Sequence, residues 1–132
     1  MPPPYNALHI ISPLNYNLEE KTMTIDEYQQ LAMVTLNPAL SRKDVLINGV
    51  MGLCGESGEA IDIVKKHLAQ GHPLDKEKLI KELGDIAWYL AETAYALEVP
   101  LSAVFEGNIE KLRKRYPEGF DSMKSIHRSE AE

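Results

Sequence analysis

Four segments with helical periodicity, separated by short breaks, most constrain the fold of this chain. The breaks lie at Pro38, between Gly71 and Pro73, at Pro100 and at Pro117, and proline and glycine are residues that commonly end a helix. No segment alternates apolar and polar residues over the length of a strand, and Asn48-Gly49 falls inside a helical pattern. The sequence therefore predicts an all-α fold, a four-helix bundle with short connections.

Capping signals mark the points at which these helices begin. Thr24 and Glu27 form a capping box, in which each side chain accepts a hydrogen bond from the other residue's backbone N–H. Ser41 and Asp75 are of the kind that caps a helix N-terminus, and Asp44 adds a favourable negative charge to the first turn of the second helix. We expect helices over residues 25–37, 42–70, 76–98 and 102–116.

Residues 1–22 differ in composition from the helical segments. Prolines at positions 2, 3, 4 and 13 are scattered there among asparagine and tyrosine without a helical period. We expect an extended or flexible arm at 1–22, one folded domain at 23–120 and a polar tail at 121–132. Because a chain of 132 residues buries only a small core, we expect oligomerisation to complete the bundle.

Charge and composition exclude several classes of function. A formal net charge of −6 has the wrong sign for a nucleic-acid-binding surface, which needs a basic patch. No apolar run approaches the roughly 18 residues that cross a bilayer, and the N-terminus lacks the pattern of a signal peptide. The single cysteine, Cys54, excludes an intramolecular disulfide. We therefore expect a cytoplasmic protein that binds neither nucleic acid nor membrane.

Two pairs of acidic residues stand out within the second and third helical segments. Glu56 and Glu59 are three residues apart, and so are Glu82 and Asp85. On a helix this spacing places both members of a pair on one face, with Cβ atoms about 5–6 Å apart, so their charges repel. A solvated face, where water screens the repulsion, is the simpler interpretation of either pair alone.

The residues around these pairs favour a metal site over a solvated face. The other positions of the stripes through Glu56 and Glu82 are apolar: Gly49, Leu53, Ala60, Ile63, Leu79 and Ile86. Carboxylates that face a core must be paired, protonated or bound to a metal, and nearby lysines cannot easily satisfy acids converging from two helices. A cluster of oxygen ligands suits a hard cation. We expect Mg²⁺, with Mn²⁺ as a substitute, at Glu56, Glu59, Glu82 and Asp85.

Four glycines recur every third residue within the second helical segment, at positions 49, 52, 55 and 58. Each costs a helix interior about 1 kcal/mol relative to alanine. Either the helix breaks near Gly52–Gly55, or the glycines exclude bulk so that another helix or a ligand can approach closely.

Three blocks of sequence resemble the MazG-like family of all-α nucleoside triphosphate pyrophosphohydrolases. The first is Gly52-Leu-Cys-Gly-Glu-Ser-Gly-Glu59, the second runs from Lys81 to Leu90 and contains Glu-Leu-Gly-Asp, and the third is Asn108 to Phe120. The resemblance implies hydrolysis of a nucleoside triphosphate (NTP or dNTP) to the monophosphate and pyrophosphate. It also implies Mg²⁺ held by the four acids against the triphosphate, and a homodimer or homotetramer.

Two other interpretations remain open beside this one. A phosphoribosyl-ATP or dUTP pyrophosphohydrolase of the same superfamily would share the metal chemistry and differ in the base pocket. A non-catalytic helical interaction module would instead present its acids on a solvated face. Within the enzyme interpretation, Glu56 or Glu59 accepts a proton from the attacking water, and the sequence does not separate a base from a metal ligand.

The last helical segment carries a polar row suited to phosphate. Asn108, Lys111 and Arg115 are spaced three and four residues apart and so share one stripe. An apolar stripe beside this row would dock the helix, and it consists of Phe105, Ile109, Leu112 and Tyr116. The competing interpretation is that Lys111 and Arg115 only solvate an outer face.

Trp88 follows Asp85 by three residues and so lies near the expected metal face. It either stacks on a nucleotide base or fills the core, and we favour the core. Cys54 has no base placed to activate it, so we interpret it as a small core residue.

Overall fold

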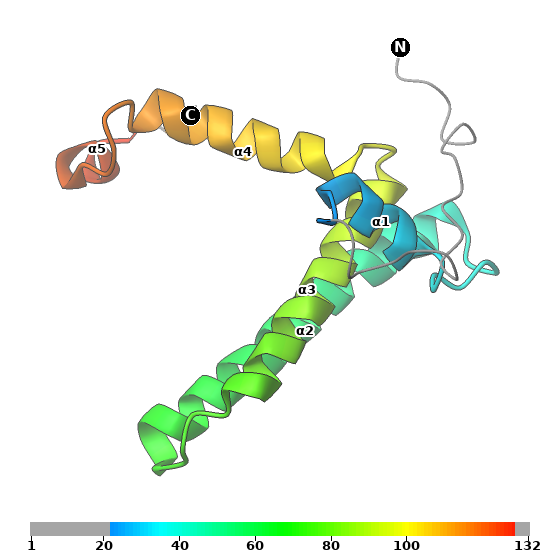
Figure 1. Cartoon of the computed structure of the whole chain (residues 1–132), viewed down its shortest axis with the longest axis horizontal. Helices are drawn as coiled ribbons and strands as arrows, with labels where there is room; N and C mark the ends of the chain where they lie inside the picture. The colour runs from blue at the N-terminus through cyan, green and yellow to red at the C-terminus, as the bar shows by residue number, and fades with distance from the viewer. Residues whose placement is uncertain (1–21, 129–132) are drawn as a thin grey trace. The chain divides into compact units, whose positions relative to one another are not determined.

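The computed structural model describes residues 22–128 and shows an all-helical chain, which confirms the predicted fold class. The predicted arm at 1–22 therefore lies almost wholly outside the described residues. The helices are α1 (Ile25–Met33), α2 (Arg42–Gln70), α3 (Lys76–Ala96), α4 (Leu101–Arg115) and α5 (Ser122–Ile126) (Figure 1). The described part of the chain contains no strand beyond an isolated bridge between Pro117 and Gly119. It divides into two compact units, one ending at Leu101 and one beginning at Ser102.

The capping signals place the helix starts as the sequence predicts. Thr24 and Glu27 form both bonds of the capping box, at 3.1 and 2.9 Å. The Ser41 hydroxyl accepts from the backbone N–H of Asp44 at 3.1 Å, and Asp75 caps α3 in the same way. Gly71 ends α2 in the left-handed conformation, with φ of 73°, which glycine adopts without steric cost.

Three features differ from the prediction: the end of α1, the end of α3, which comes at Ala96, and the C-terminal tail. α1 stops at Met33, because residues 34–36 form tighter turns whose N–H groups bond three residues back, as Val34 does to Leu31. The polar tail contains the short helix α5, which Asp121 caps through the N–H of Lys124. A five-residue helix is too short for its periodicity to be visible in sequence.

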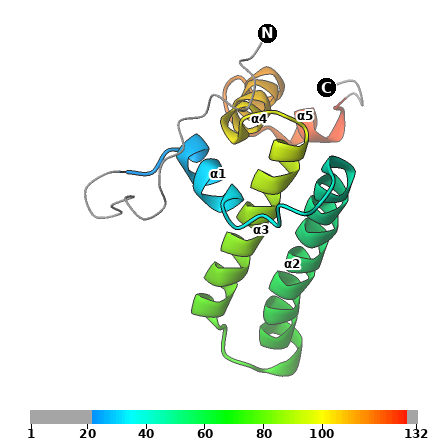
Figure 2. The ribbon, with the colours of Figure 1, turned by 90° about the vertical axis from the view of Figure 1, so that its right-hand side faces the viewer.

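In the first unit, α2 and α3 form a long antiparallel hairpin and α1 packs against α3 (Figures 1 and 2). The buried core lies where α1 meets the end of α3, and its members are Ala32, Ala91, Ala94 and Leu101. Buried Gln29 joins these elements. Its Nε2 donates to the carbonyls of Ala91 and Val99, and its Oε1 accepts from the N–H of Leu101 at 2.9 Å.

The glycines of α2 allow close packing and do not break the helix, which runs unbroken through all four. A Cβ on Gly49 would lie 2.5 Å from the hydroxyl of Thr93, and one on Gly52 would overlap the ring of Tyr89. Both contacts are to α3, so these two glycines set the approach of the hairpin helices. Gly55 and Gly58 differ, because a Cβ on either would meet nothing within 4 Å.

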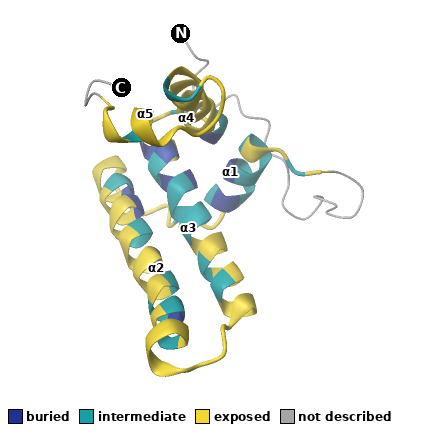
Figure 3. Ribbon diagram, turned by 90° about the vertical axis from the view of Figure 1, so that its left-hand side faces the viewer, coloured by how far each residue is buried: buried dark blue, intermediate teal, exposed yellow. Residues whose placement is uncertain are grey.

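α2 is largely exposed along its length (Figure 3). Only Val45, Gly49 and Ile63 of its 29 residues are buried. Cys54, which the sequence analysis placed in the core, is exposed. Among the described helices, none is both long and apolar enough to cross a membrane.

Candidate functional site

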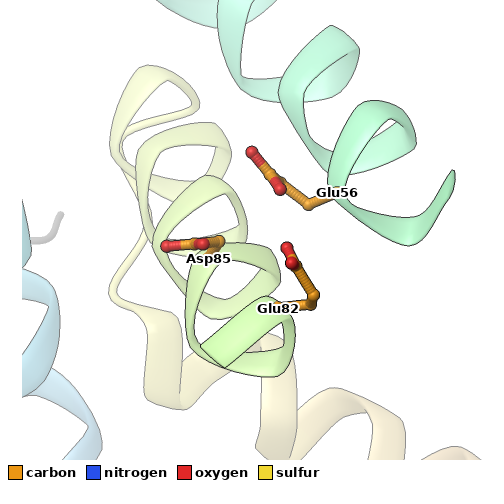
Figure 4. A group of neighbouring side chains, drawn as sticks. All are labelled: Glu56, Glu82 and Asp85. Atoms are coloured by element: carbon orange, nitrogen blue, oxygen red, sulfur yellow. The ribbon is translucent and has the colours of Figure 1, made fainter. Parts of the chain in front are cut away.

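Three of the four predicted acids come together between the hairpin helices. Glu56 reaches from α2 towards Glu82 and Asp85 on α3 (Figure 4). One carboxylate oxygen from each residue lies within 4.8 Å of the other two. Glu56 and Glu82 are half-buried and Asp85 is exposed, so the cluster is open to a ligand from solvent.

The packing of the glycines explains why these acids meet. Gly49 faces Thr93 and Gly52 faces Tyr89. In an antiparallel hairpin, each step forward along α2 is matched by an equal step back along α3, and residues four apart share one face of a helix. Four residues after Gly52 on α2 is Glu56, and four residues before Tyr89 on α3 is Asp85. These two acids therefore lie level with each other.

The carboxylates perturb one another. Burial raises the pKa of Glu56, and the negative charges of Asp85, Glu82 and Glu59 and a hydrogen bond with Glu82 raise it further. No lysine or arginine forms an ion pair with the cluster in the described part of the chain. Lys65 and Lys66 instead bind Asp62, at 2.8 and 2.6 Å. Concentrated negative charge without a protein counter-ion favours a bound cation or proton.

α1 brings an aromatic group towards this site that the sequence did not single out. Burial raises the pKa of Tyr28, and so does the negative charge of Asp85, which indicates that its hydroxyl lies near that carboxylate. Tyr28 occupies an ordinary apolar position of α1 and packs against the core. No sequence signal distinguished it from a core residue.

Trp88 docks α1 on α3. Its indole N–H donates to the carbonyl of Ala32 at 3.0 Å and to the hydroxyl of Thr35 at 2.9 Å. The ring packs against the core and meets Tyr89 edge-on, with ring centroids 5.0 Å apart. These contacts support the core interpretation of Trp88 over base stacking.

Comparison with known proteins identifies the family. The sequence model of the MazG nucleotide pyrophosphohydrolase domain matches residues 48–120. The chain belongs to this family. The match contains the three blocks that carried the resemblance, so that prediction is confirmed. The MazG match also includes all three clustered acids and the polar row of α4.

A relative of this MazG protein occurs in a bacteriophage. The Gene 37 protein of Mycobacterium phage L5 is 41% identical over 73 residues, which cover 52% of this chain. The aligned region spans 64% of the phage protein, somewhat less than two thirds of its length. No solved structure matches the chain.

The remaining candidate residues of the MazG protein lie outside the three-acid group. Glu59 is exposed on α2, close enough for its charge to act on Glu56. Asn108, Lys111 and Arg115 lie along α4, in the second unit. The Nε of Arg115 is buried and has no hydrogen-bond partner among the described residues. The roles of all four towards metal or phosphate stay predictions.

Proposed function

We propose that this chain is a Mg²⁺-dependent nucleoside triphosphate pyrophosphohydrolase, which cleaves an NTP or dNTP to the monophosphate and pyrophosphate. The observation that carries the proposal is the meeting of Glu56, Glu82 and Asp85 within 4.8 Å, in a chain whose family is that of a nucleotide pyrophosphohydrolase domain. A cation bound between the two helices would compensate the charge of these three acids.

The donor set fits Mg²⁺. All three groups offer carboxylate oxygens, and Mg²⁺ prefers such ligands together with substrate phosphates. The bonds of Mg²⁺ to oxygen are about 2.1 Å long, so neighbouring ligand oxygens in its octahedral shell are about 3 Å apart. Carboxylate oxygens that now lie within 4.8 Å of one another would have to move closer by up to about 2 Å to share one ion, which rotation of partly exposed side chains allows. Mn²⁺ takes the same oxygen ligands and is expected to substitute.

The reaction adds water across the α–β phosphoanhydride. The oxygen of water bonds to the α-phosphorus, the bond to the bridging oxygen breaks, and pyrophosphate leaves. When bound, the cation supplies neutralising charge for the phosphates and acidifies water. Glu56, or Glu59 beside it, accepts the proton of the attacking water. Lys111 and Arg115 donate hydrogen bonds to phosphate oxygens as negative charge builds on the leaving group. Asn108, in the same row, helps to orient the phosphates.

The net negative charge of the chain is compatible with a free nucleotide as substrate and disfavours nucleic acid. A net charge of −6 repels a nucleic-acid backbone, whereas a single triphosphate needs only a local cationic site. We propose a cytoplasmic enzyme that acts on the nucleotide pool and works as a homodimer or homotetramer.

Pyrophosphate release, measured with Mg²⁺ and a panel of nucleotides that includes dUTP and phosphoribosyl-ATP, tests the proposal. Asp85→Asn should lower kcat by at least about 100-fold, because one oxygen ligand loses its charge. The matched control is Asp62→Asn on α2, since Asp62 is already neutralised by Lys65 and Lys66 and its loss should leave activity unchanged. Equal activity of wild type and Asp85→Asn, or no turnover of any nucleotide by wild type, would overturn the proposal.

A further inference from the structure

A cavity of about 330 Å³ lies at the end of the hairpin where α2 begins beside the end of α3 (Figure 2). The segment that joins α1 to α2 contributes Leu36 and Leu40 to its apolar lining, and α2 contributes the buried Val45. Small-molecule pockets in proteins have volumes of about 300–1,000 Å³. The cavity therefore has room for a ligand of about the size of a nucleoside.

This cavity is separate from the acid cluster. Tyr95, which also lines it, follows Asp85 by ten residues on α3, so the two lie about 15 Å apart along the helix axis. Between them, α2 and α3 are in direct contact, because the glycines at positions 49 and 52 pack against Thr93 and Tyr89. A ligand in the cavity therefore does not enter the space between the helices that the acids occupy.

An arginine and a glutamate lie side by side on the wall of the cavity. Arg42, in the first turn of α2, forms an ion pair with Glu98, which follows the end of α3. The two side chains are 62% and 60% exposed, and an ion pair so exposed contributes little to stability. Each group also retains further donors or acceptors for a ligand while the pair persists.

Glu98 occupies a backbone position that favours glycine. Its N–H donates to the carbonyl of Tyr95, and the N–H of Val99 donates to that of Ala94, both at 3.0 Å. These bonds end α3 in a Schellman motif, in which the residue at the position of Glu98 is usually glycine. Glu98 has φ of 60° and is the only non-glycine with positive φ among the described residues.

This backbone conformation of Glu98 is strained, and strained residues cluster at ligand sites. Glycine would remove the strain at this position. The exposed ion pair with Arg42 is too weak to offset the strain. A ligand that binds the carboxylate of Glu98 accounts for a glutamate here.

We propose that the cavity binds the base of a guanine nucleoside, as a second ligand site apart from the acid cluster. The carboxylate of Glu98 accepts from N1–H and the 2-amino group of guanine, two adjacent donors that one carboxylate binds with both oxygens. Arg42 donates to O6 or N7, the acceptors that arginine commonly binds on guanine. Tyr95 supplies an aromatic surface on which the base can stack.

The carboxylate of Glu98 also excludes the other bases. Adenine and cytosine offer one amino group without an adjacent N–H donor, and uracil offers one N–H between two carbonyl oxygens. Each would leave an oxygen of Glu98 unpaired or facing another acceptor, which costs affinity. The arrangement therefore selects guanine, and it does so through groups that the proposed hydrolysis does not use.

Calorimetric titration of the full chain with guanosine in EDTA tests the proposal. Guanosine has no phosphate for the acid cluster, and EDTA removes metal ions. We expect guanosine to bind, and adenosine, cytidine and uridine to bind at least about 10-fold more weakly. Inosine, which lacks only the 2-amino group, should also bind about 10-fold more weakly, since one hydrogen bond to a charged group is lost. No binding of guanosine, or equal affinities for the nucleosides, would overturn the proposal.

Two variants separate binding from folding. Glu98→Gly relieves the strained φ, so its Tm should rise while its affinity for guanosine falls at least about 10-fold. Arg42→Gln should weaken guanosine binding similarly. The matched control is Lys43→Gln, because Lys43 is exposed and is the next residue of α2, and this variant should bind as the unmodified chain does. Unchanged affinity in Glu98→Gly would overturn the proposal.

A third variant distinguishes this site from the acid cluster. Asp85→Asn should bind guanosine as tightly as the unmodified chain, whether or not the chain hydrolyses nucleotides. Weaker binding by Asp85→Asn than by the unmodified chain would mean that guanosine occupies the acid cluster, and would overturn the proposal of a second site.

Discussion

Glu92 is fully buried, and the side-chain amide of Asn48 donates to both of its carboxylate oxygens, at 2.9 and 3.0 Å. Burial raises the pKa of Glu92, and the hydrogen bond from Asn48 offsets part of that effect. One amide cannot replace the water that an ionised carboxylate loses on burial. The folded state therefore favours the protonated acid.

Glu92 should make stability fall as pH rises. In the unfolded chain its carboxyl ionises near pH 4.5, and in the folded chain it keeps its proton to higher pH. Between these two pKa values the unfolded state has fewer bound protons than the folded state. The stabilising contribution of Glu92 is therefore complete below pH 4.5 and is lost as pH rises through the pKa of the folded state. Glu92→Gln should remove this dependence and raise the free energy of unfolding at pH 7 by about 1 kcal/mol.

Thermal melts between pH 4.5 and pH 8 measure this effect. Glu110→Gln is the matched control, since Glu110 is exposed and pairs with Lys114 on its own helix, at 3.7 Å. Its stability profile should follow that of the unmodified chain. A Glu92→Gln profile as steep as that of the unmodified chain would show that Glu92 is ionised in the fold.

At the scale of helices, the contact between α2 and α3 depends on positions that lack a side chain. Gly49→Ala should destabilise the fold by about 1–3 kcal/mol, because the new Cβ would meet the hydroxyl of Thr93 at 2.5 Å and its backbone N at 3.2 Å. Gly84→Ala on α3 is the matched control. A Cβ there meets nothing within 4 Å, so alanine should stabilise the helix by up to about 1 kcal/mol. Chemical denaturation measures both, and equal effects of the two substitutions would contradict this account.

Local signals predicted the helices well because capping is a short-range interaction. Ser41 and Gly71 bound α2 as expected, since each acts on its own helix end. The apolar stripes through Glu56 and Glu82 also predicted that these acids face the core side of their helices, because helical periodicity fixes a face. The end of α3 was missed: the helix stops at Ala96, and Glu98 follows with φ of 60°.

The parts that sequence did not predict depend on contacts between elements. Gln29 is a polar residue at a buried position, and its role is visible only when Ala91, Val99 and Leu101 surround it. Tyr28 approaches the acids only because α1 folds against α3. A spacing rule describes one helix at a time, so it cannot report such pairings.

For the whole molecule, binding of Mg²⁺ should be coupled to folding. The three acids meet only when α2 and α3 pair, so the unfolded chain lacks the site. A ligand that binds only the folded state adds about 2.7 kcal/mol at 100 times its Kd, which raises Tm by several degrees. Mg²⁺ with a non-hydrolysable nucleoside triphosphate should produce this shift, and Mg²⁺ alone a smaller one.

The rise in Tm on binding Mg²⁺ should depend on the cluster of Glu56, Glu82 and Asp85 and not on the overall charge of the chain. The double variant Glu56→Gln, Glu82→Gln should lose it, although its Tm without metal should rise because repulsion from Asp85 is relieved. Asp26→Asn with Asp44→Asn removes the same charge from the first turns of α1 and α2 and should keep the full shift. Equal shifts in both double variants would mean that the cation binds diffusely to an acidic protein. No shift in the unmodified chain would indicate a helical interaction module, whose acids form only a solvated surface.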